Sequence, residues 1–470
     1  MIFSRKICFS VGTAELRQYA VVILVNLSVL TTGMGLAWSS PMLVKLTDEE
    51  ETPLNRTITE EEGSWIVSIG SLASILSNFL VGVLMDSIGR KYCILLTCVP
   101  KLIIALLFIF ATDIWMLILG RTVNGAIDSF LFIAVPVYAS EIASKEMRGS
   151  LCTFLQIFSS LGIVVTLSVG PFVSYVTFNT IFAVVILVTS VPLLFLPDTP
   201  FFLHSKGKTD KALEVLTYLR DSEQLAKEEI ATYAQTENDE KIDKISIFKD
   251  RVVLKSFAIT IVFCACTQLV GFNAVSFYLQ TILVSTNSNV SPEIASVVIG
   301  MIQLLASFCT TILGDKFKRK QILITSLIGM FFGMVGLGVF FKIKEDVEVF
   351  GFLNYLPLIS LILVVYSYSA GIGSLMWVLI AELFDGPARA IGVTTSLMVT
   401  TIFIFITTKY FSFLTLSIGP AITYWMFSGM CILTCIFIYF CVPETKGKSF
   451  SEIQTELRGE KQTKGDAEKS

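Results

Sequence analysis

Apolar residues run in long stretches along this chain, separated by short polar segments. Many stretches contain about 20 residues, the length needed to cross a hydrocarbon core roughly 30 Å thick. Because backbone groups in lipid must be hydrogen-bonded within their own segment, stretches this apolar are predicted to be helices and not strands. Twelve spans are expected, near 18–41, 64–85, 92–112, 114–138, 150–172, 178–196, 253–284, 292–314, 321–342, 352–380, 390–411 and 418–442.

A polar stretch at 204–252 divides the spans into two sets of six. It is rich in Lys, Glu, Asp and Gln, and apolar residues at helical spacing in 211–219 predict short helices there. The expected fold class is an all-α membrane protein with twelve transmembrane helices in two six-helix pseudo-repeats and a cytoplasmic helical insert. The expected parts are an N-terminal segment (1–17), a first bundle (18–203), a linker (204–252), a second bundle (253–442) and a tail (443–470).

Two charge signatures at the ends of spans occur once in each half. An acid is followed by a base four residues later, and a glutamate precedes an arginine by seven residues. The residues are Asp86, Arg90, Glu141 and Arg148 in the first half and Asp315, Arg319, Glu382 and Arg389 in the second. The pattern predicts parallel repeats, as in rocking transporters. At the membrane edge these groups could lock the two bundles together or release them; the alternative is that they fix topology or anchor helix ends.

The distribution of basic residues predicts the orientation of the spans. Lys and Arg gather in the two tails, the polar insert and the even-numbered loops, and the opposite loops contain only Lys45, Arg56, Lys342 and Lys344. By the positive-inside rule both ends are expected in the cytoplasm. The first outward loop is acidic and contains Asn55-Arg56-Thr57, a motif for glycosylation at Asn55. A solvated loop is the simplest interpretation of its acidity, and attraction of substrate is the alternative.

The composition and the absence of certain motifs disfavour several classes of function. With 54% hydrophobic and 16% charged residues, the chain lacks the charge that the surface of a soluble enzyme needs. His204 is the only histidine, and no Walker-type loop, HExxH or GxSxG motif is present, so ATP-driven pumping and catalysis are disfavoured. Cys264 and Cys266 have no histidine nearby, so no metal and no other cofactor is expected. A net charge of −3 without a basic face disfavours a nucleic-acid partner, and the lipid bilayer is the expected one.

Short motifs along nearly the whole chain carry a family resemblance. In order they are Asp86-x-x-Gly89-Arg90-Lys91, Gly120-Arg121, Pro136-Val137-Tyr138-x-x-Glu141, Arg148-Gly149, Gln156, Pro197-Asp-Thr-Pro200, Gln268-x-x-Gly271-x-Asn273, Glu382-Leu-Phe and Pro443-Glu-Thr-Lys-Gly-Lys448. Together they resemble the sugar-transporter branch of the major facilitator superfamily. Two further strings, 33–41 and 59–66, resemble the arthropod facilitated trehalose transporters. The resemblance implies the major facilitator fold and a small-molecule sugar as substrate, with a monomer sufficient for transport.

The resemblance also implies a set of sugar-binding residues. Amides occupy positions where the family contacts sugar, and the aromatic residue of the tenth span is kept; these residues are Gln156, Gln268, Asn273, Gln303 and Trp377. Amides suit this role because a sugar offers hydrogen-bond donors and acceptors but no charge, and an aromatic wall suits its C–H face. For each amide the alternative is that it joins neighbouring helices.

Departures from the family pattern bear on the substrate. Thr267 stands where a paired Gln is usual, and Thr400 and Thr401 stand where many members of the family carry Asn-Trp. The usual prolines are absent from 371–377, so the tenth span is expected to be less broken than in the family. Because several hexose contacts are lost, a different or larger sugar than glucose is favoured.

Ionisable residues inside the spans bear on energy coupling. Proton-coupled members of the family carry a carboxylate in the first span, where this chain has none, and this favours passive uniport. Asp128 lies in the fourth span, seven residues after Arg121, and Lys101 of the third span is expected at similar depth because the two spans turn near Asp113. A structural pair with Lys101 and a proton site are the two interpretations of Asp128.

These features predict a facilitative sugar transporter that moves trehalose or a related sugar across the plasma membrane by alternating access. The sequence leaves other functions open. They are a carrier for glucose, another hexose or a polyol, a carrier for an organic anion, a proton-coupled symporter, and a sugar sensor that binds without transporting.

Overall fold

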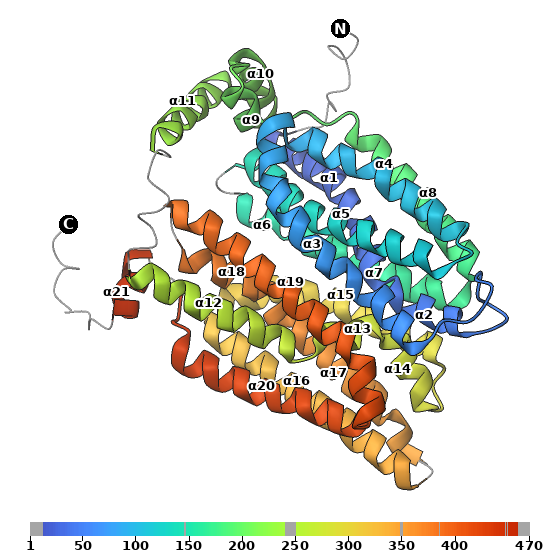
Figure 1. Ribbon diagram of the computed structural model, residues 1–470. Coiled ribbons are helices and arrows are strands. Elements are labelled where there is room, and N and C mark those ends of the chain that lie inside the picture. Colours follow the sequence, from blue (N-terminus) through green and yellow to red (C-terminus); the bar gives the residue numbers. More distant parts are fainter. Residues whose placement is uncertain are drawn as a thin grey trace. The chain divides into compact units, whose positions relative to one another are not determined.

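The computed structural model describes residues 13–144, 147–239, 251–347, 351–384, 386–446, 448 and 450–458. These residues are helical nearly throughout and contain no strand (Figure 1). The chain divides into two compact units, Met1–Lys241 and Ile242–Ser470, which we call the first and the second unit. Each unit is described by itself below.

The first unit contains the apolar helices of the first half and the polar insert. Its elements are α1 (Ala14–Ala37), α2 (Ser39–Thr47), α3 (Glu60–Ile88), α4 (Arg90–Ile109), α5 (Ile114–Ile142), α6 (Arg148–Cys152), α7 (Phe154–Val169), the 3-10 turn η1 (Gly170–Phe172), α8 (Tyr175–Leu193), α9 (Pro200–Ser205), α10 (Thr209–Arg220) and α11 (Glu223–Asp239). Helices α9 to α11 form the insert, which therefore belongs to the first unit.

The second unit contains the apolar helices of the second half and one short helix after them. Its elements are α12 (Arg251–Leu269), α13 (Phe272–Phe277), α14 (Leu279–Thr286), α15 (Pro292–Lys316), α16 (Arg319–Asp346), the 3-10 turn η3 (Gly351–Tyr355), α17 (Leu356–Ala370), α18 (Ile372–Leu383), α19 (Gly386–Ser417), α20 (Pro420–Cys441) and α21 (Phe450–Arg458). Helix α21 packs on α12 and α18 through Ile453 and Leu457, and Lys255 donates to the Leu457 carbonyl at 2.7 Å.

Twelve helical stretches among the described residues are long and apolar enough to cross a membrane, six in each unit. They are Ala14–Thr47, Glu60–Ile88, Arg90–Ile109, Ile114–Ile142, Arg148–Phe172, Tyr175–Leu193, Arg251–Phe277, Pro292–Thr310, Arg319–Asp346, Gly351–Ile380, Ile391–Ser417 and Pro420–Cys441. Each overlaps one of the spans predicted from the apolar pattern. The fold class expected from the sequence is confirmed.

The two units repeat the same helix neighbours. In the first unit α1 packs on α7, α3 on α5, and α4 on both α5 and α8. In the second unit the corresponding pairs are α12 with α19, α15 with α17, and α16 with both α17 and α20 (Figure 1). Charge signatures and packing therefore repeat together, as expected of a six-helix unit that is used twice.

Small residues let helices of the first unit approach closely. A Cβ on Gly125 of α5 would collide with the backbone of Gly70 on α3, so position 125 needs glycine. The Ser74 hydroxyl, one turn further along α3, donates to the Gly125 carbonyl at 2.9 Å. In a membrane, where lipid is as apolar as the side chains, such backbone approach and interhelical hydrogen bonds hold helices together.

Local sequence fixes where α3 begins. The Thr59 hydroxyl accepts a hydrogen bond from the Glu62 N–H at 3.3 Å, and the Glu62 carboxylate accepts one from the Thr59 N–H at 2.8 Å. This capping box satisfies amide groups that have no partner within the helix. Arg56 also donates to Glu62, and this carboxylate raises the pKa of Arg56. Asn55 is exposed beside them, in the loop before the helix.

Two spans of the second unit are interrupted. Helix α12 ends at Leu269, and Gly271 has a φ of 85°, a left-handed conformation that favours glycine. The tenth span is divided at Gly371, between α17 and α18, although it lacks the prolines that are usual in the family. The sequence predicts a less broken span here than in the family, and that comparison stays a prediction.

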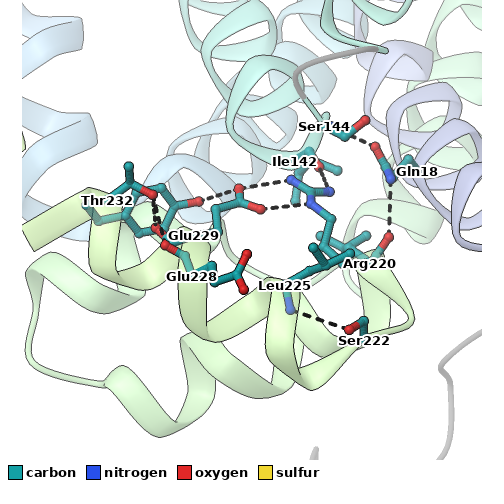
Figure 2. A network of polar contacts seen from close by, with 11 residues as sticks. Gln18, Ile142, Ser144, Arg220, Ser222, Leu225, Glu228, Glu229 and Thr232 are labelled. Carbon is teal, nitrogen blue, oxygen red and sulfur yellow. Dashed lines mark hydrogen bonds and ion pairs between the residues drawn. The ribbon is translucent and has the colours of Figure 1, made fainter.

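The insert is fastened to the ends of α1 and α5 by a network of polar contacts (Figure 2). Arg220 pairs with Glu229 of α11 at 2.8 and 3.0 Å and donates to the Ile142 carbonyl at 2.9 Å. Ile142 ends α5, so this carbonyl has no partner within its own helix. Gln18 of α1 accepts from the Ser144 N–H at 2.8 Å and donates to the Leu219 carbonyl at 3.2 Å. The Arg220 side chain is only 7% exposed.

We expect Arg220→Met to loosen the insert. The change leaves the Ile142 carbonyl without its donor and the Glu229 carboxylate with the Tyr233 hydroxyl in place of the guanidinium, which costs about 1–3 kcal/mol. The rate of limited proteolysis within α10 and α11 measures the loss and should rise clearly. Lys227→Met is the matched control, because Lys227 pairs with Glu223 on one helix and both side chains are more than 60% exposed. Equal proteolysis rates for the two variants would contradict a fastening role for Arg220.

Candidate functional site

One cluster of charges lies where α4 begins. Arg90 pairs with Glu141 of α5 at 3.0 Å and with Asp86 of α3 at 3.4 Å, and it donates to the Met85 carbonyl at 3.1 Å. The side chains of Arg90 and Glu141 are 8% and 15% exposed, whereas that of Asp86 is 78% exposed. The buried pair of Arg90 and Glu141 therefore joins α4 to α5. The pair with Asp86 contributes little to stability, because solvent screens its charge.

Asp198 completes the cluster from the segment before α9. Its carboxylate accepts from the backbone N–H of Lys91 at 3.2 Å and of Thr199 at 2.9 Å, so it caps the amino end of α4. The Lys91 ammonium in turn donates to the Leu194 carbonyl at 2.9 Å. Burial raises the pKa of Asp198, and the hydrogen bonds from Thr199 and Lys91 act in the opposite direction.

The second unit repeats this arrangement at the beginning of α16. Arg319 pairs with Glu382 of α18 at 3.5 Å, and the Thr445 hydroxyl donates to Glu382 at 2.6 Å. Glu444 accepts from the backbone N–H groups of Arg319 at 3.0 Å and Lys320 at 3.2 Å, so it occupies the place that Asp198 has in the first unit. Lys320 also donates to a carbonyl, that of Val442, at 3.0 Å.

Each glutamate thus meets the arginine of its own unit. Arg148 is exposed and forms no ion pair with a described residue. The side chains of Asp315 and Arg389 lie outside the described part of the structure. The charge pattern did not reveal the capping role of Asp198 and Glu444, although Pro197-Asp-Thr and Pro443-Glu-Thr recur at corresponding places in the sequence.

A second polar group is buried in the middle of the first unit. Lys101 of α4 pairs with Asp128 of α5 at 2.8 Å, and its ammonium also donates to the hydroxyls of Thr31 and Thr32 on α1 at 3.0 and 2.8 Å. Asn124 donates to the other Asp128 oxygen at 2.6 Å. Lys101 is 2% exposed and Asp128 5%. The two residues, for which the turn near Asp113 predicted a similar depth, therefore lie in contact, and the structural role of the pair stays a prediction.

Arg121 has partners of another kind. It donates to the carbonyls of Gly35 on α1 at 2.8 Å and Ile66 on α3 at 3.2 Å, and its guanidinium lies 5.5 Å from the ring centre of Trp38. Trp38 in turn donates to Asn179 of α8 at 2.8 Å. Arg121 thus joins α5 to α1 and α3 through backbone acceptors, while Lys101 and Asp128 compensate each other.

Two side-chain amides of the second unit meet at the break after α12, one of them buried and the other partly exposed. The Asn273 side chain donates to the side-chain oxygen of Gln268 (Oε1) at 2.6 Å, across Gly271. The Gln268 amide nitrogen lies 3.9 Å from the sulfur of Met376 on α18, and the Thr267 hydroxyl lies 3.3 Å from the same sulfur. Gln268 is 2% exposed, so its amide is matched by neighbouring polar groups and not by water. No pattern in the sequence marks Met376 as a neighbour of Gln268.

The other predicted sugar-binding residues lie on different helices. Gln156 of α7 donates to the Ser160 hydroxyl at 3.4 Å. Gln303 of α15 is 6% exposed, and Trp377 of α18 is 37% exposed. Among the five predicted residues, Gln268 and Asn273 are joined by a hydrogen bond. Within the described residues, no group of three or more His, Cys, Asp or Glu could hold a metal ion.

Solved transporter structures share this fold. The chain superposes on the xylose transporter XylE from E. coli in its inward open conformation with a TM-score of 0.78, covering 93% of this chain and 99% of that one at 18% identity. A partially occluded inward open conformation of XylE gives 0.77, with 92% and 99% coverage at 20% identity. The protein is a multi-pass membrane protein with the fold of this class of transporters.

Proteins of similar sequence show to which family of transporters the chain belongs. The facilitated trehalose transporter Tret1 of Polypedilum vanderplanki is 29% identical over 446 residues, which are 94% of this chain and 88% of that protein. Tret1 of Apis mellifera ligustica is 28% identical over 455 residues, with the same coverage. The family described as "Sugar (and other) transporter" matches residues 28–457, and the chain belongs to this family.

Proposed function

We propose that this protein is a facilitative carrier that moves trehalose or a related sugar across the plasma membrane, with both termini in the cytoplasm. The observation that carries the proposal is the hydrogen-bonded amide pair of buried Gln268 and partly exposed Asn273, at the place where a span is interrupted. The relatives named as facilitated trehalose transporters support trehalose as the first sugar to test. The abundance of Lys and Arg in the tails and insert supports the orientation. No enzymatic activity is part of the proposal.

Uncharged amides fit a sugar as the ligand. Gln268 and Asn273 offer two carbonyl oxygens and two amino groups, which match hydroxyls that both donate and accept. A carboxylate or an ammonium group in this place would favour a charged ligand instead. Gln156, Gln303 and Trp377 are proposed to complete the sugar-binding set.

Alternating access is proposed to use the two repeated charge clusters. Ion pairs that are partly exposed, such as that of Arg319 and Glu382, contribute about 0–1 kcal/mol each. An ion pair as weak as that of Arg319 and Glu382 suits a switch between two states of nearly equal free energy. Transport is proposed to be passive, because residues 18–41 of the first span contain no acid and Asp128 already has Lys101 as its counter-charge.

The test is uptake of labelled trehalose and labelled glucose by oocytes that express the chain, at two external pH values. We expect saturable trehalose entry that does not depend on pH and is abolished by Gln268→Ala. Gln321→Ala is the matched control, because Gln321 is exposed on α16, away from the amide pair. Surface labelling shows that each variant reaches the membrane.

Other outcomes separate the competing functions. Accumulation against a gradient at acidic pH would indicate a proton-coupled symporter. Entry of glucose without trehalose would change the substrate and keep the class. Saturable binding without entry of either sugar, at normal surface expression, would contradict transport and favour a sensor.

A further inference from the structure

The environment of Gln268 contains one weak hydrogen-bond partner. Its side-chain oxygen accepts from Asn273 at 2.6 Å. One N–H of its side-chain amide donates to the Tyr368 hydroxyl oxygen. A second partner of this nitrogen is the Met376 sulfur at 3.9 Å, which faces its other N–H. A thioether is a weak acceptor compared with an oxygen. The N–H of Gln268 that faces Met376 therefore forms a stronger hydrogen bond when an oxygen takes the place of the sulfur.

Burial makes Met376 an obstacle as well as a partner. Asn273 is partly exposed, whereas Gln268 and Met376 are each 2% exposed. A ligand that contacts Asn273 reaches the Gln268 nitrogen only if a neighbouring side chain moves. Methionine is unbranched, has three rotatable side-chain bonds and adapts to irregular space. Aromatic neighbours cannot move as easily, because Phe272 is stacked on Tyr368 with ring centres 3.6 Å apart.

We propose that Met376 is a specificity-determining residue that holds the Gln268 amide in place when no sugar is bound. When sugar binds, a sugar hydroxyl replaces the Met376 sulfur as the partner of this amide. The proposal rests on the sugar-carrier function proposed above. Met376 acts through Gln268 and is a positioning residue. Because the sulfur is a weak acceptor, little hydrogen-bond free energy is lost when a sugar hydroxyl replaces it as the partner of Gln268. A strong acceptor would compete with the ligand for the same donor.

The test compares Met376→Gln with Met376→Leu in the uptake assay. Met376→Gln places a strong acceptor beside Gln268, and the Thr267 hydroxyl can pair with the new amino group, because it already lies 3.3 Å from the sulfur. We expect the KM for sugar entry to rise about threefold to tenfold, the effect of one competing hydrogen bond, with the maximal rate per surface transporter unchanged. Met376→Leu keeps the volume without an acceptor, and its KM should not exceed that of the parent chain.

Controls make the result decisive. Met330→Leu changes a buried methionine of α16 and should leave KM and maximal rate unaltered. If Met376→Gln does not reach the surface, Met376→Thr supplies a smaller oxygen acceptor and should raise KM in the same direction. An equal rise of KM in Met376→Leu, or an unchanged KM in Met376→Gln at normal surface expression, would overturn the role of Met376. Absence of sugar entry in the parent chain would instead overturn the carrier function.

Discussion

Replacing Asp128 by Asn is expected to lower the amount of folded protein far more than it changes the pH dependence of transport. Lys101 is 2% exposed and has Asp128 as its only acidic partner among the described residues. Removing one partner of a buried ion pair leaves an uncompensated charge, at a cost of about 3–5 kcal/mol. The measurements are the thermal unfolding midpoint in detergent and the yield of monodisperse protein.

Two further variants distinguish a structural pair from a proton site. Asp86→Asn is the control for stability, because the Asp86 side chain is 78% exposed and its loss should change the midpoint little. The double change Lys101→Met with Asp128→Leu removes both charges and should recover much of the stability lost in the single variant. A normal yield of Asp128→Asn together with the loss of pH-driven accumulation would contradict both the structural role and passive transport.

The sequence predicted the fold well because a membrane simplifies the problem. The bilayer fixes the minimum length of a span, and lipid requires that its backbone be helical, so apolar length alone located all twelve spans. Charge signatures repeated at span ends revealed the two copies of the unit. The depth argument for Lys101 and Asp128 also succeeded, because two helices joined by a short turn have related depths.

Other features could not be read from the sequence, because they depend on contacts between distant helices. Met376 touches Gln268 across 108 positions of the chain, and no local pattern marks such a contact. The capping carboxylates Asp198 and Glu444 lie far in sequence from the helices they cap, α4 and α16. The tenth span is divided between α17 and α18 although it lacks the usual prolines, and no local pattern marked Gly371 as the residue where α17 would stop.

Replacing Gly271 by Ala is expected to disrupt both folding and sugar binding. Gly271 has a φ of 85°, and an added Cβ would lie 2.6 Å from the ring of Phe427 on α20. Left-handed backbone in a residue with a Cβ costs about 1–2 kcal/mol, and the overpacking costs about 1–3 kcal/mol more. Relief of the collision must move either Phe427 or the segment after α12. Asn273 is on that segment, so its hydrogen bond to Gln268 should lengthen and the KM for sugar should rise about tenfold or more.

Gly207→Ala isolates the effect of backbone strain. Gly207 has a φ of 72°, but an added Cβ would meet nothing within 4 Å. This variant should therefore lose only about 1–2 kcal/mol and keep the parent KM. Unfolding midpoints and uptake of both glycine variants measure the difference. If the KM of Gly271→Ala equalled that of Gly207→Ala, the break after α12 would not be what holds Asn273 against Gln268, and the binding residues would have to be sought on helices remote from it.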